Sequence, residues 1–317
     1  MNTSDMKAFE EGDILVGATL LNNPEDDHAG PGRIIQFDSD LNLKGTLWTD
    51  NTTHLVGGLK FDPNKNLWAF DSQNCSAIKV NASGEQIDQA DFGDRSFSNV
   101  NFLGSGEILL GEHLTGDESN NKALEGPRKL GTVLPFMPGT ERYGDGNIYK
   151  FSKEGNLTAT YETETHGGMP GFLGVTSSAV APDESKIIYI SELGNRIFQY
   201  DIASNTQLDD LITYDPESGN MVIAIGFSNS GDFYSIKANF REGFSLCFHD
   251  LASGSIIDEK VLPGPGWATL CLCGDSKHAV LGNFFNGQIG KFDLSSGQMV
   301  ASAETDVERS VAGIAEF

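Results

Sequence analysis

The sequence predicts an all-β fold, a six-bladed β-propeller, because one phrase recurs six times at a long and regular spacing. The phrase is an apolar strand that ends in a polar residue and runs through a tight polar turn into a second strand. Its copies span residues 33–38, 77–81, 147–152, 196–201, 246–250 and 288–293. Self-similarity at a fixed long period indicates a repeat architecture, and a hairpin-containing unit of about 45–50 residues matches a propeller blade.

A second pair of strands precedes each hairpin and completes a four-stranded blade. This pair is clearest at residues 55–61 and 67–71, which flank a turn rich in Asp, Pro and Asn. Because each blade shares a core with its neighbours, residues 1–317 are expected to form a single domain. The blades are predicted at residues 13–50 with 310–317, 54–93, 97–164, 173–215, 220–262 and 266–305.

The first blade lacks an innermost strand at the N-terminal end of the chain. Residues 13–16 are the only strand before the first hairpin, whereas residues 310–317 form a lone strand at the other end. The C-terminal strand is therefore expected to lie innermost in the first blade and to close the ring. Closure removes the sheet edges that an open array would expose.

Two loops that join a second strand to a third are longer than a turn requires. Residues 20–32 form the first loop, and residues 114–146 form a long insertion in the third blade. Long loops in a compact domain are usually functional lids or disordered inserts. The 114–146 insertion is expected to be a lid over the channel mouth, with a disordered insert as the alternative.

Acidic residues outnumber basic ones, 45 to 21, which gives a formal net charge of −24. Such a surface repels phosphate backbones and anionic lipids, so neither nucleic acid nor a membrane is expected as a partner. The four cysteines show no CxxC pair and are expected to be buried thiols. The sequence shows neither an apolar signal region nor an apolar run that could span a bilayer, so a cytoplasmic protein is expected. The oligomeric state is left open.

Aligning the six copies places the last residue of each second strand at the mouth of the central channel. These residues are Ala18, Asp71, Glu112, Glu192, Lys237 and Asn283. A carboxylate beside an ammonium group shifts both proton affinities and can serve acid–base chemistry. The alternative is a solvated ring of polar groups that satisfy one another.

Four of the six histidines fall in loops on the same face of the predicted propeller, and the other two, His249 and His278, are expected to be structural. The four are His28, His54, His113 and His166. Neutral imidazoles, with Glu112 beside His113, could bind a divalent transition metal or supply a general base. No HxxxH spacing supports a metal site, and scattered surface histidines are the alternative.

The innermost strands bring further side chains to the channel mouth, where they are expected to bind a substrate. They are His54, Asn99, Thr176, Asn220, Trp267 and Arg309. An aromatic floor with a few converging polar groups is the usual composition of a small-molecule pocket. The sequence has no GxSxG elbow, P-loop or HExxH, which excludes the enzyme classes that are most easily read from motifs.

Residues 181–201, which read APDESKIIYISELGNRIFQYD, resemble the blade consensus of the SMP-30/gluconolactonase family of six-bladed propellers. That family includes the calcium-dependent diisopropylfluorophosphatase, and the long insertion after residues 107–112 also resembles this phosphatase. NHL-repeat and strictosidine-synthase-like propellers share the blade pattern. The resemblance, which covers the whole ring, therefore implies the fold more directly than the function.

The resemblance implies a catalytic calcium ion, held in the channel by one Glu, two Asn and one Asp from innermost strands. Only Asn99 in the third blade matches this ligand set. The fourth-blade Asn position carries Thr176, the fifth-blade Asp position falls in residues 222–224, and Glu308 fits only with a shifted register. The calcium ligands are mostly absent, so the cofactor is left open between no metal and a divalent metal on His28, His54, His113 or His166.

The expected function is hydrolysis of a small-molecule lactone or ester at the channel mouth. Water attack would be assisted by His54, Glu112, His113 or Glu192. Two cations, the catalytic candidate Lys237 and the substrate-binding candidate Arg309, would face a developing oxyanion or a substrate carboxylate. The remaining substrate-binding candidates are Asp71, Asn99, His166, Thr176, Asn220, Trp267 and Asn283. Two alternatives stay open: a lyase or isomerase on the same scaffold, and a propeller that binds a ligand or a protein without catalysis.

Overall fold

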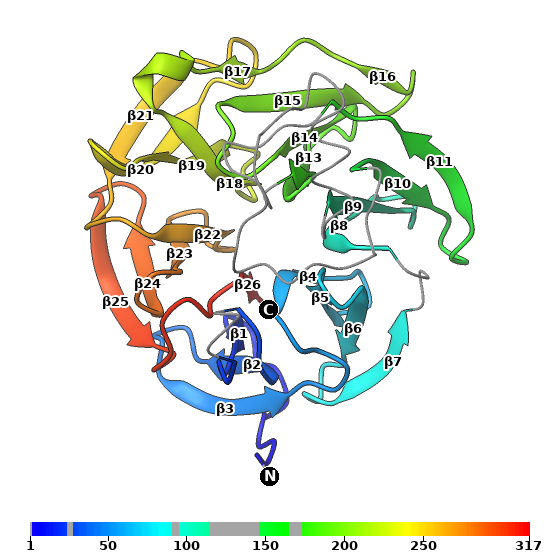
Figure 1. Cartoon of the computed structure of the whole chain (residues 1–317), viewed down its shortest axis with the longest axis vertical. Helices are drawn as coiled ribbons and strands as arrows, with labels where there is room; N and C mark the ends of the chain where they lie inside the picture. The colour runs from blue at the N-terminus through cyan, green and yellow to red at the C-terminus, as the bar shows by residue number, and fades with distance from the viewer. Residues whose placement is uncertain (1, 24–27, 91–94, 115–145, 165–172) are drawn as a thin grey trace. The chain divides into compact units, whose positions relative to one another are not determined.

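The computed structural model describes residues 2–23, 28–90, 95–114, 146–164 and 173–317 of the chain. Among these residues the regular structure is almost entirely β, with one short 3-10 helix at Pro216–Ser218. The strands form six antiparallel sheets, and each sheet contains one copy of the repeated phrase. The protein is therefore an all-β, six-bladed β-propeller, as the repeat predicts (Figure 1). The blades group into two compact units, which are described one at a time: Met1–Gly93 with Gly266–Phe317, and Asp94–Pro265.

Blade one belongs to the first unit and joins the two ends of the chain. Its strands, in spatial order, are β26 (Gly313–Glu316), β1 (Ile14–Thr19), β2 (Gly32–Phe37) and β3 (Leu43–Trp48). Strand β26 pairs antiparallel with β1, so that Ile14 lies opposite Glu316 and Val16 opposite Ile314. Figure 1 shows the red strand β26 beside the blue strand β1. The C-terminal strand thus completes the first blade, which confirms the prediction.

Blades two and six complete the first unit, and each is a four-stranded antiparallel sheet with its strands in sequence order. Blade two consists of β4 (Gly57–Phe61), β5 (Leu67–Asp71), β6 (Ser76–Val80) and β7 (Gln86–Ala90). Blade six consists of β22 (Trp267–Leu272), β23 (His278–Asn283), β24 (Gln288–Asp293) and β25 (Gln298–Glu304).

Strand β26 contributes to two apolar clusters in the described part of the first unit. Ala315 packs in one cluster with Leu15 and Leu67, whereas Ile314 packs in the other with Val16 and Val280. Successive residues of a strand point to opposite faces, so a single strand can serve two neighbouring cores. The closing strand therefore holds blade one together and also fills the space on both of its sides.

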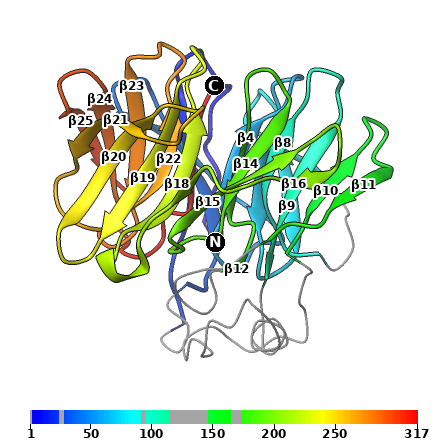
Figure 2. The same cartoon turned by 90° about the horizontal axis from the view of Figure 1, so that it is seen from above.

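Blades three, four and five make up the second unit (Figure 2). Blade three contains β8 (Phe97–Phe102), β9 (Ile108–Leu114), β10 (Ile148–Phe151) and β11 (Leu157–Tyr161), with the short β12 (Leu173–Gly174) added to β9. Blade four contains β13 (Ser177–Val180), β14 (Lys186–Ile190), β15 (Arg196–Asp201), β16 (Thr206–Gln207) and β17 (Ile212–Thr213). Blade five contains β18 (Met221–Phe227), β19 (Phe233–Asn239), β20 (Gly243–His249) and β21 (Ile256–Val261).

One predicted boundary is wrong, because residues 173 and 174 belong to blade three and not to blade four. Strand β12 pairs with the end of β9, with Gly174 opposite His113. Strand β9 extends past Gly111, the last residue that pairs with β10, and the end of β9 is therefore open to a different partner. Nearly all of the 114–146 insertion lies outside the described residues, so its role as a lid stays a prediction.

No disulfide joins the four cysteines, all of which lie in the described residues. Cys247 and Cys273 are buried and Cys75 and Cys271 are partly buried, so burial is complete for two of the four thiols. Within the part of the chain that the structure describes, no helix has the length and the apolar character needed to cross a bilayer.

Candidate functional site

Strand pairing tests the alignment that placed six side chains at equivalent positions. Five of the six occupy one common position relative to the third strand of their blade. The pairs, taken from the ladders and their direct continuation, are Ala18–Arg33, Asp71–Ser76, Glu112–Asn147, Lys237–Ser245 and Asn283–Gln288. The repeat is therefore a reliable guide to position in five blades.

Glu192 is the exception, and its predicted alignment is wrong by one residue. Tyr189 pairs with Phe198. If this register continues for two more residues, Ser191 lies opposite Arg196, and Ser191 is fully buried. A slip of one residue moves a side chain to the other face of a strand. Glu192 therefore lies in the β14–β15 turn and points differently from the equivalent residues of the other blades.

The side chain of Asp71 is fully buried and caps the backbone around it. Its Oδ2 atom accepts hydrogen bonds from the backbone N–H groups of Thr53 (2.8 Å) and His54 (2.9 Å), and its Oδ1 atom accepts one from Asn74 (3.0 Å). The buried Asn283 caps its own turn in the same way, because its Oδ1 atom accepts from the N–H group of Phe285. Both residues, predicted to bind substrate, have their oxygen atoms committed to the fold.

Asp71→Ala is expected to lower the free energy of unfolding by about 3 kcal/mol or more. The substitution leaves backbone donors without their acceptor in a buried site, and each such donor costs about 1–3 kcal/mol. Urea denaturation followed by tryptophan fluorescence measures the change, since all three tryptophans, Trp48, Trp68 and Trp267, lie in the first unit.

The matched control is Asp38→Ala, in which the carboxylate lost is also a cap. Asp38 Oδ1 accepts from the backbone N–H groups of Asp40 and Asn42, but in an exposed turn where water can replace it. Its removal is expected to cost about 1 kcal/mol. Equal losses for the two variants would show that burial does not set the role of Asp71.

Glu112 is fully buried and forms an ion pair with Arg95, Oε1 to Nη1, at 3.0 Å. Its Oε2 atom accepts hydrogen bonds from the hydroxyl of Tyr149 (3.1 Å) and from the backbone N–H of Gly146 (3.2 Å). The Arg95 guanidinium also stacks on the Tyr149 ring at 4.3 Å. A buried carboxylate held by this many donors is the usual arrangement of a structural ion pair.

Lys237 pairs with Glu259 on the outermost strand of the same blade, Nζ to Oε1, at 2.6 Å. Strand β19 also continues two residues beyond Lys237, to Asn239. The alignment expected Lys237 to be the last residue of its strand, and it is not. Its ammonium group is directed across β20 toward β21. Its predicted catalytic role stays untested.

Glu192 differs from these groups in its exposure and its protonation. The residue is partly exposed, and the described residues show no hydrogen bond or ion pair to its carboxyl group, whereas its backbone N–H donates to Thr176 Oγ1 at 2.7 Å. Desolvation by the surrounding protein raises the pKa of the Glu192 carboxyl to about 8. A carboxyl group with this pKa changes its protonation state near neutral pH, which suits it to proton transfer.

A row of polar side chains holds the segment that carries Thr176. The Thr176 hydroxyl donates to Ile190 O at 3.2 Å, and the Asn99 amide donates to Val175 O at 2.9 Å. Ser98 Oγ also donates to Val175 O, and Ser178 Oγ donates to Asn99 Oδ1. The predicted pair Asn99 and Thr176 therefore lies near Glu192 in the second unit, where both residues fix the backbone on which Glu192 depends.

The structure brings two of the four predicted histidines together. His28 and His54, both buried, lie in the first unit with ring centroids 6.1 Å apart, and His28 stacks on Phe284 at 5.5 Å. His113 is partly buried at the end of β9 in the second unit, and His166 lies outside the described residues. Among the described residues no three His, Cys, Asp or Glu side chains form a group that could hold a metal.

The other predicted substrate contacts are placed as follows. Trp267 is fully buried, and its indole ring lies 3.2 Å from where a Cβ at Gly290 would stand, so it packs inside blade six rather than forming an exposed floor. Arg309 has a left-handed backbone, with φ of 58°, and its N–H donates to Phe284 O at 2.7 Å. Asn220 is partly buried, and its Oδ1 atom accepts from Asn239.

The residues at the positions where the sequence resemblance implies calcium ligands do not fit a calcium ion. The Asn99 oxygen accepts the Ser178 hydroxyl, and the Thr176 oxygen accepts the Glu192 N–H. Residues 222–224 are Val, Ile and Ala with buried side chains that carry no oxygen. Calcium requires six to eight oxygen ligands, which these residues do not supply.

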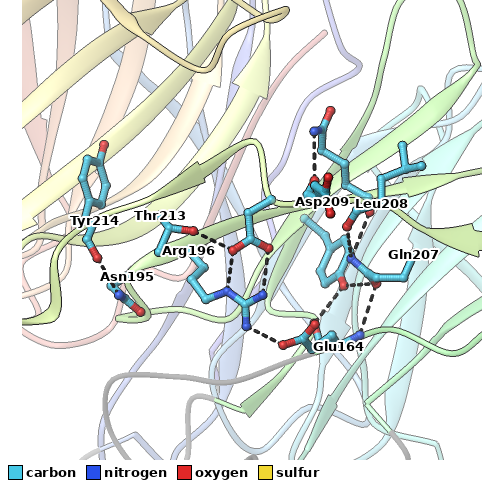
Figure 3. A network of polar contacts seen from close by, with 11 residues as sticks. Glu164, Asn195, Arg196, Gln207, Leu208, Asp209, Thr213 and Tyr214 are labelled. Carbon is cyan, nitrogen blue, oxygen red and sulfur yellow. Dashed lines mark hydrogen bonds and ion pairs between the residues drawn. The ribbon is translucent and has the colours of Figure 1, made fainter.

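A second polar network joins strands β14 and β15 of blade four to Glu164, which follows β11 of blade three (Figure 3). Arg196 forms a bidentate pair with Asp210, at 2.6 and 2.8 Å, and a third contact with Glu164 at 2.5 Å. The Tyr189 hydroxyl donates to Glu164 O and Gln207 Oε1. Paired charges of this kind fix β15 to its neighbours, whereas the Glu192 carboxyl group is not committed in this way.

Comparisons with known proteins bear on the fold. No family model matches the sequence, and no curated protein matches it. A chain from a nidogen/laminin complex is similar in structure over 96% of this chain and 98% of its own length, with a TM-score of 0.65 and 13% sequence identity. Streptogramin B lyase is a more distant match, with a TM-score of 0.49, 16% identity, and coverage of 80% of this chain and 68% of its own. At these identities the likeness concerns the fold alone.

Proposed function

We propose that the protein is a small-molecule hydrolase of the SMP-30/gluconolactonase-like type, in which Glu192 acts as the general base on a lactone or ester. The observation that supports this proposal is the state of the Glu192 carboxyl group, which is partly exposed, desolvated and held in place through its backbone by Thr176. Asp71 and Glu112, by contrast, are buried and bound by several donors. Glu192 is thus the acidic candidate whose oxygen atoms can meet a substrate.

The raised pKa makes ionised Glu192 a stronger base than an ordinary carboxylate. A general base is most effective when its pKa lies near the working pH. The carboxylate would take a proton from water while the water oxygen attacks the carbonyl carbon and the carbonyl π electrons move to oxygen. The tetrahedral species would then expel the alkoxide, which recovers the proton from Glu192. This series of reaction steps needs no metal and returns the Glu192 carboxylate to its starting state.

A lyase or isomerase is the second candidate, and the same observation favours it. A carboxylate with a pKa near 8 can also remove a proton from a carbon beside a carbonyl group. The two reactions differ in product, since hydrolysis of a lactone or ester releases a new carboxylic acid and elimination or isomerisation does not.

The test is a panel of γ- and δ-lactones and aryl esters, followed by acid release in a pH-stat between pH 6 and 9.5. At least one compound is expected to be turned over, with kcat/KM rising with pH to a plateau and half of the plateau reached near pH 8. The direction follows because a general base works only when ionised, and Glu192 ionises as the pH rises through its pKa. Activity that falls above pH 8, or does not change with pH, would contradict Glu192 as the base.

A further inference from the structure

Strand β21 is the outermost strand of blade five, and one of its two edges pairs with β20. Within the described part of the second unit, no strand pairs with its other edge. An unpaired edge is a template on which an extended segment of another chain can form backbone hydrogen bonds. Blade one shows an outer edge that is occupied in this way, because the Asp5 N–H donates to Thr46 O on β3 at 2.9 Å.

Strand β21 also exposes more apolar side chains than the other outermost strands. Ile256, Ile257 and Val261 are 37%, 58% and 72% exposed. Among the described residues, every other outermost strand exposes at most one large apolar side chain. Apolar side chains that gather beside an open edge indicate a surface that binds protein.

The hydrogen bonds at the end of β21 show which of its backbone groups face the open edge. The Leu262 N–H donates to Phe244 O on β20 at 2.8 Å, so the backbone of Leu262 faces the sheet. Because this direction alternates along an antiparallel strand, the backbone groups of Glu259 and Val261 face outward. The Glu259 N–H accordingly donates to Asp258 Oδ1, on its own strand, at 2.9 Å. A partner strand can therefore pair at Glu259 and Val261.

The sequence of β21, IIDEKV, matches a second copy of itself in one antiparallel register. With Glu259 on the two-fold axis, Asp258 of each copy lies opposite Lys260 of the other. The same register places Ile257 of each copy opposite Val261 of the other. A register moved by two residues would instead place two Asp258 or two Lys260 side chains opposite each other, which is destabilising. Charge complementarity thus selects a single register.

The remaining charges do not oppose this register. The two Glu259 carboxylates would meet near the axis, but each is neutralised within its own chain by Lys237, Nζ to Oε1, at 2.6 Å. Lys260 and Asp258 also pair within each strand at 3.0 Å, so the four charges across the interface alternate in sign. The net charge of −24 acts against self-association, yet at about 0.15 M salt charges more than about 8 Å apart are largely screened. The pairs on β21 therefore decide the outcome.

We propose that β21 is a homodimerisation surface, on which a second copy of this chain adds its own β21 in antiparallel register with Glu259 at the two-fold axis. In the dimer the Glu259 N–H leaves Asp258 for the Glu259 carbonyl of the second copy. An interface one strand wide belongs with the small, transient interfaces, so a dissociation constant on the order of 10–100 µM is expected. The proposal does not depend on the role of Glu192.

Sedimentation equilibrium of the full chain at about 0.15 M salt, from about 1 to 500 µM protein, tests the dimer. Asp258→Lys and Lys260→Asp are each expected to weaken dimerisation about 10-fold or more, because like charges then face each other twice across the axis. An equimolar mixture of the two variants is expected to recover the dimer. In the mixture one copy offers two ammonium groups where the other offers two carboxylates.

Val261→Lys and Val300→Lys are a matched pair, since both place one positive charge at an exposed valine of an outermost strand. Val261→Lys is expected to weaken dimerisation about 10-fold, because it places a charge opposite Ile257, whereas Val300→Lys on β25 keeps the wild-type dimer. Thermal midpoints equal to the wild type at a concentration where the chain is monomeric confirm that each variant is folded.

Three results would overturn the proposal. A wild-type chain that stays monomeric over the whole range would leave the β21 edge to a different partner. Equal dimerisation of the two valine variants would place the dimer contact elsewhere. A mixture of Asp258→Lys and Lys260→Asp that associates no better than either variant alone would exclude the charge-paired register.

Discussion

Deletion of residues 310–317 is expected to unfold blade one at temperatures at which the full-length chain is folded. The deletion removes the whole of β26, so β1 loses every backbone partner on that side. It also removes Val311, Ile314 and Ala315, which are 1%, 6% and 5% exposed. Burial of one large apolar side chain is worth about 1.5–3 kcal/mol. The summed loss approaches the total stability of a typical domain, about 5–15 kcal/mol.

Two point substitutions separate the packing of β26 from a general effect of truncation. Ile314→Ala is expected to lower the free energy of unfolding by about 2–4 kcal/mol, because its side chain fills a shared core. Val300→Ala, at a position that is 54% exposed on β25, is expected to change it by less than about 0.5 kcal/mol. Urea denaturation measures all three variants, and an unchanged midpoint for the deletion would show that β26 does not close the blade.

Glu192→Gln is expected to lower kcat/KM at least about 100-fold for any lactone or ester that the protein hydrolyses. General acid–base catalysis typically contributes about 10²–10⁴-fold, and an amide of the same shape cannot accept the proton. The variant should also lose the rise of kcat/KM with pH. Glu154→Gln, which changes an exposed glutamate in the same unit, is the matched control and should keep wild-type activity.

The same variant has a signature in stability that needs no substrate. Because desolvation raises the pKa of folded Glu192 above its unfolded value, ionisation is harder in the folded state. The carboxyl group therefore destabilises the fold increasingly as the pH rises from about 4.3, the ordinary Glu pKa, to about 8. Glu192→Gln should match the wild type below pH 4 and exceed its thermal midpoint at pH 8. An equal difference at both pH values would contradict the raised pKa.

The fold could be predicted from the sequence because each blade repeats the same local information. Side-chain alternation and turn residues recur six times. The lone strand at 310–317 matched the innermost strand that was missing from the first blade. The boundary at residues 173–174 could not be predicted, because β12 pairs with the last residues of β9, which extend the strand beyond the repeated pattern. Pairing across a long stretch of sequence leaves no local pattern.

The candidate site was harder to predict than the fold, because position along a repeat does not show what a side chain contacts. Asp71 and Glu192 both look like channel carboxylates in the sequence, yet Asp71 accepts three backbone N–H groups whereas Glu192 is shifted by one residue into a turn. Trp267 was expected to form an aromatic floor at the channel mouth, but it is fully buried with its ring near Gly290.

The proposed mechanism depends on the protonation of Glu192, which NMR titration of its side-chain carboxyl carbon measures. Protein labelled with ¹³C at the glutamate δ-carbon would be titrated from pH 3 to 10, with the resonance assigned by its absence in Glu192→Gln. One resonance is predicted to titrate with a midpoint near pH 8 and to disappear in that variant. A Glu192 resonance that titrates near pH 4.3, as an ordinary glutamate does, would contradict the proposed mechanism.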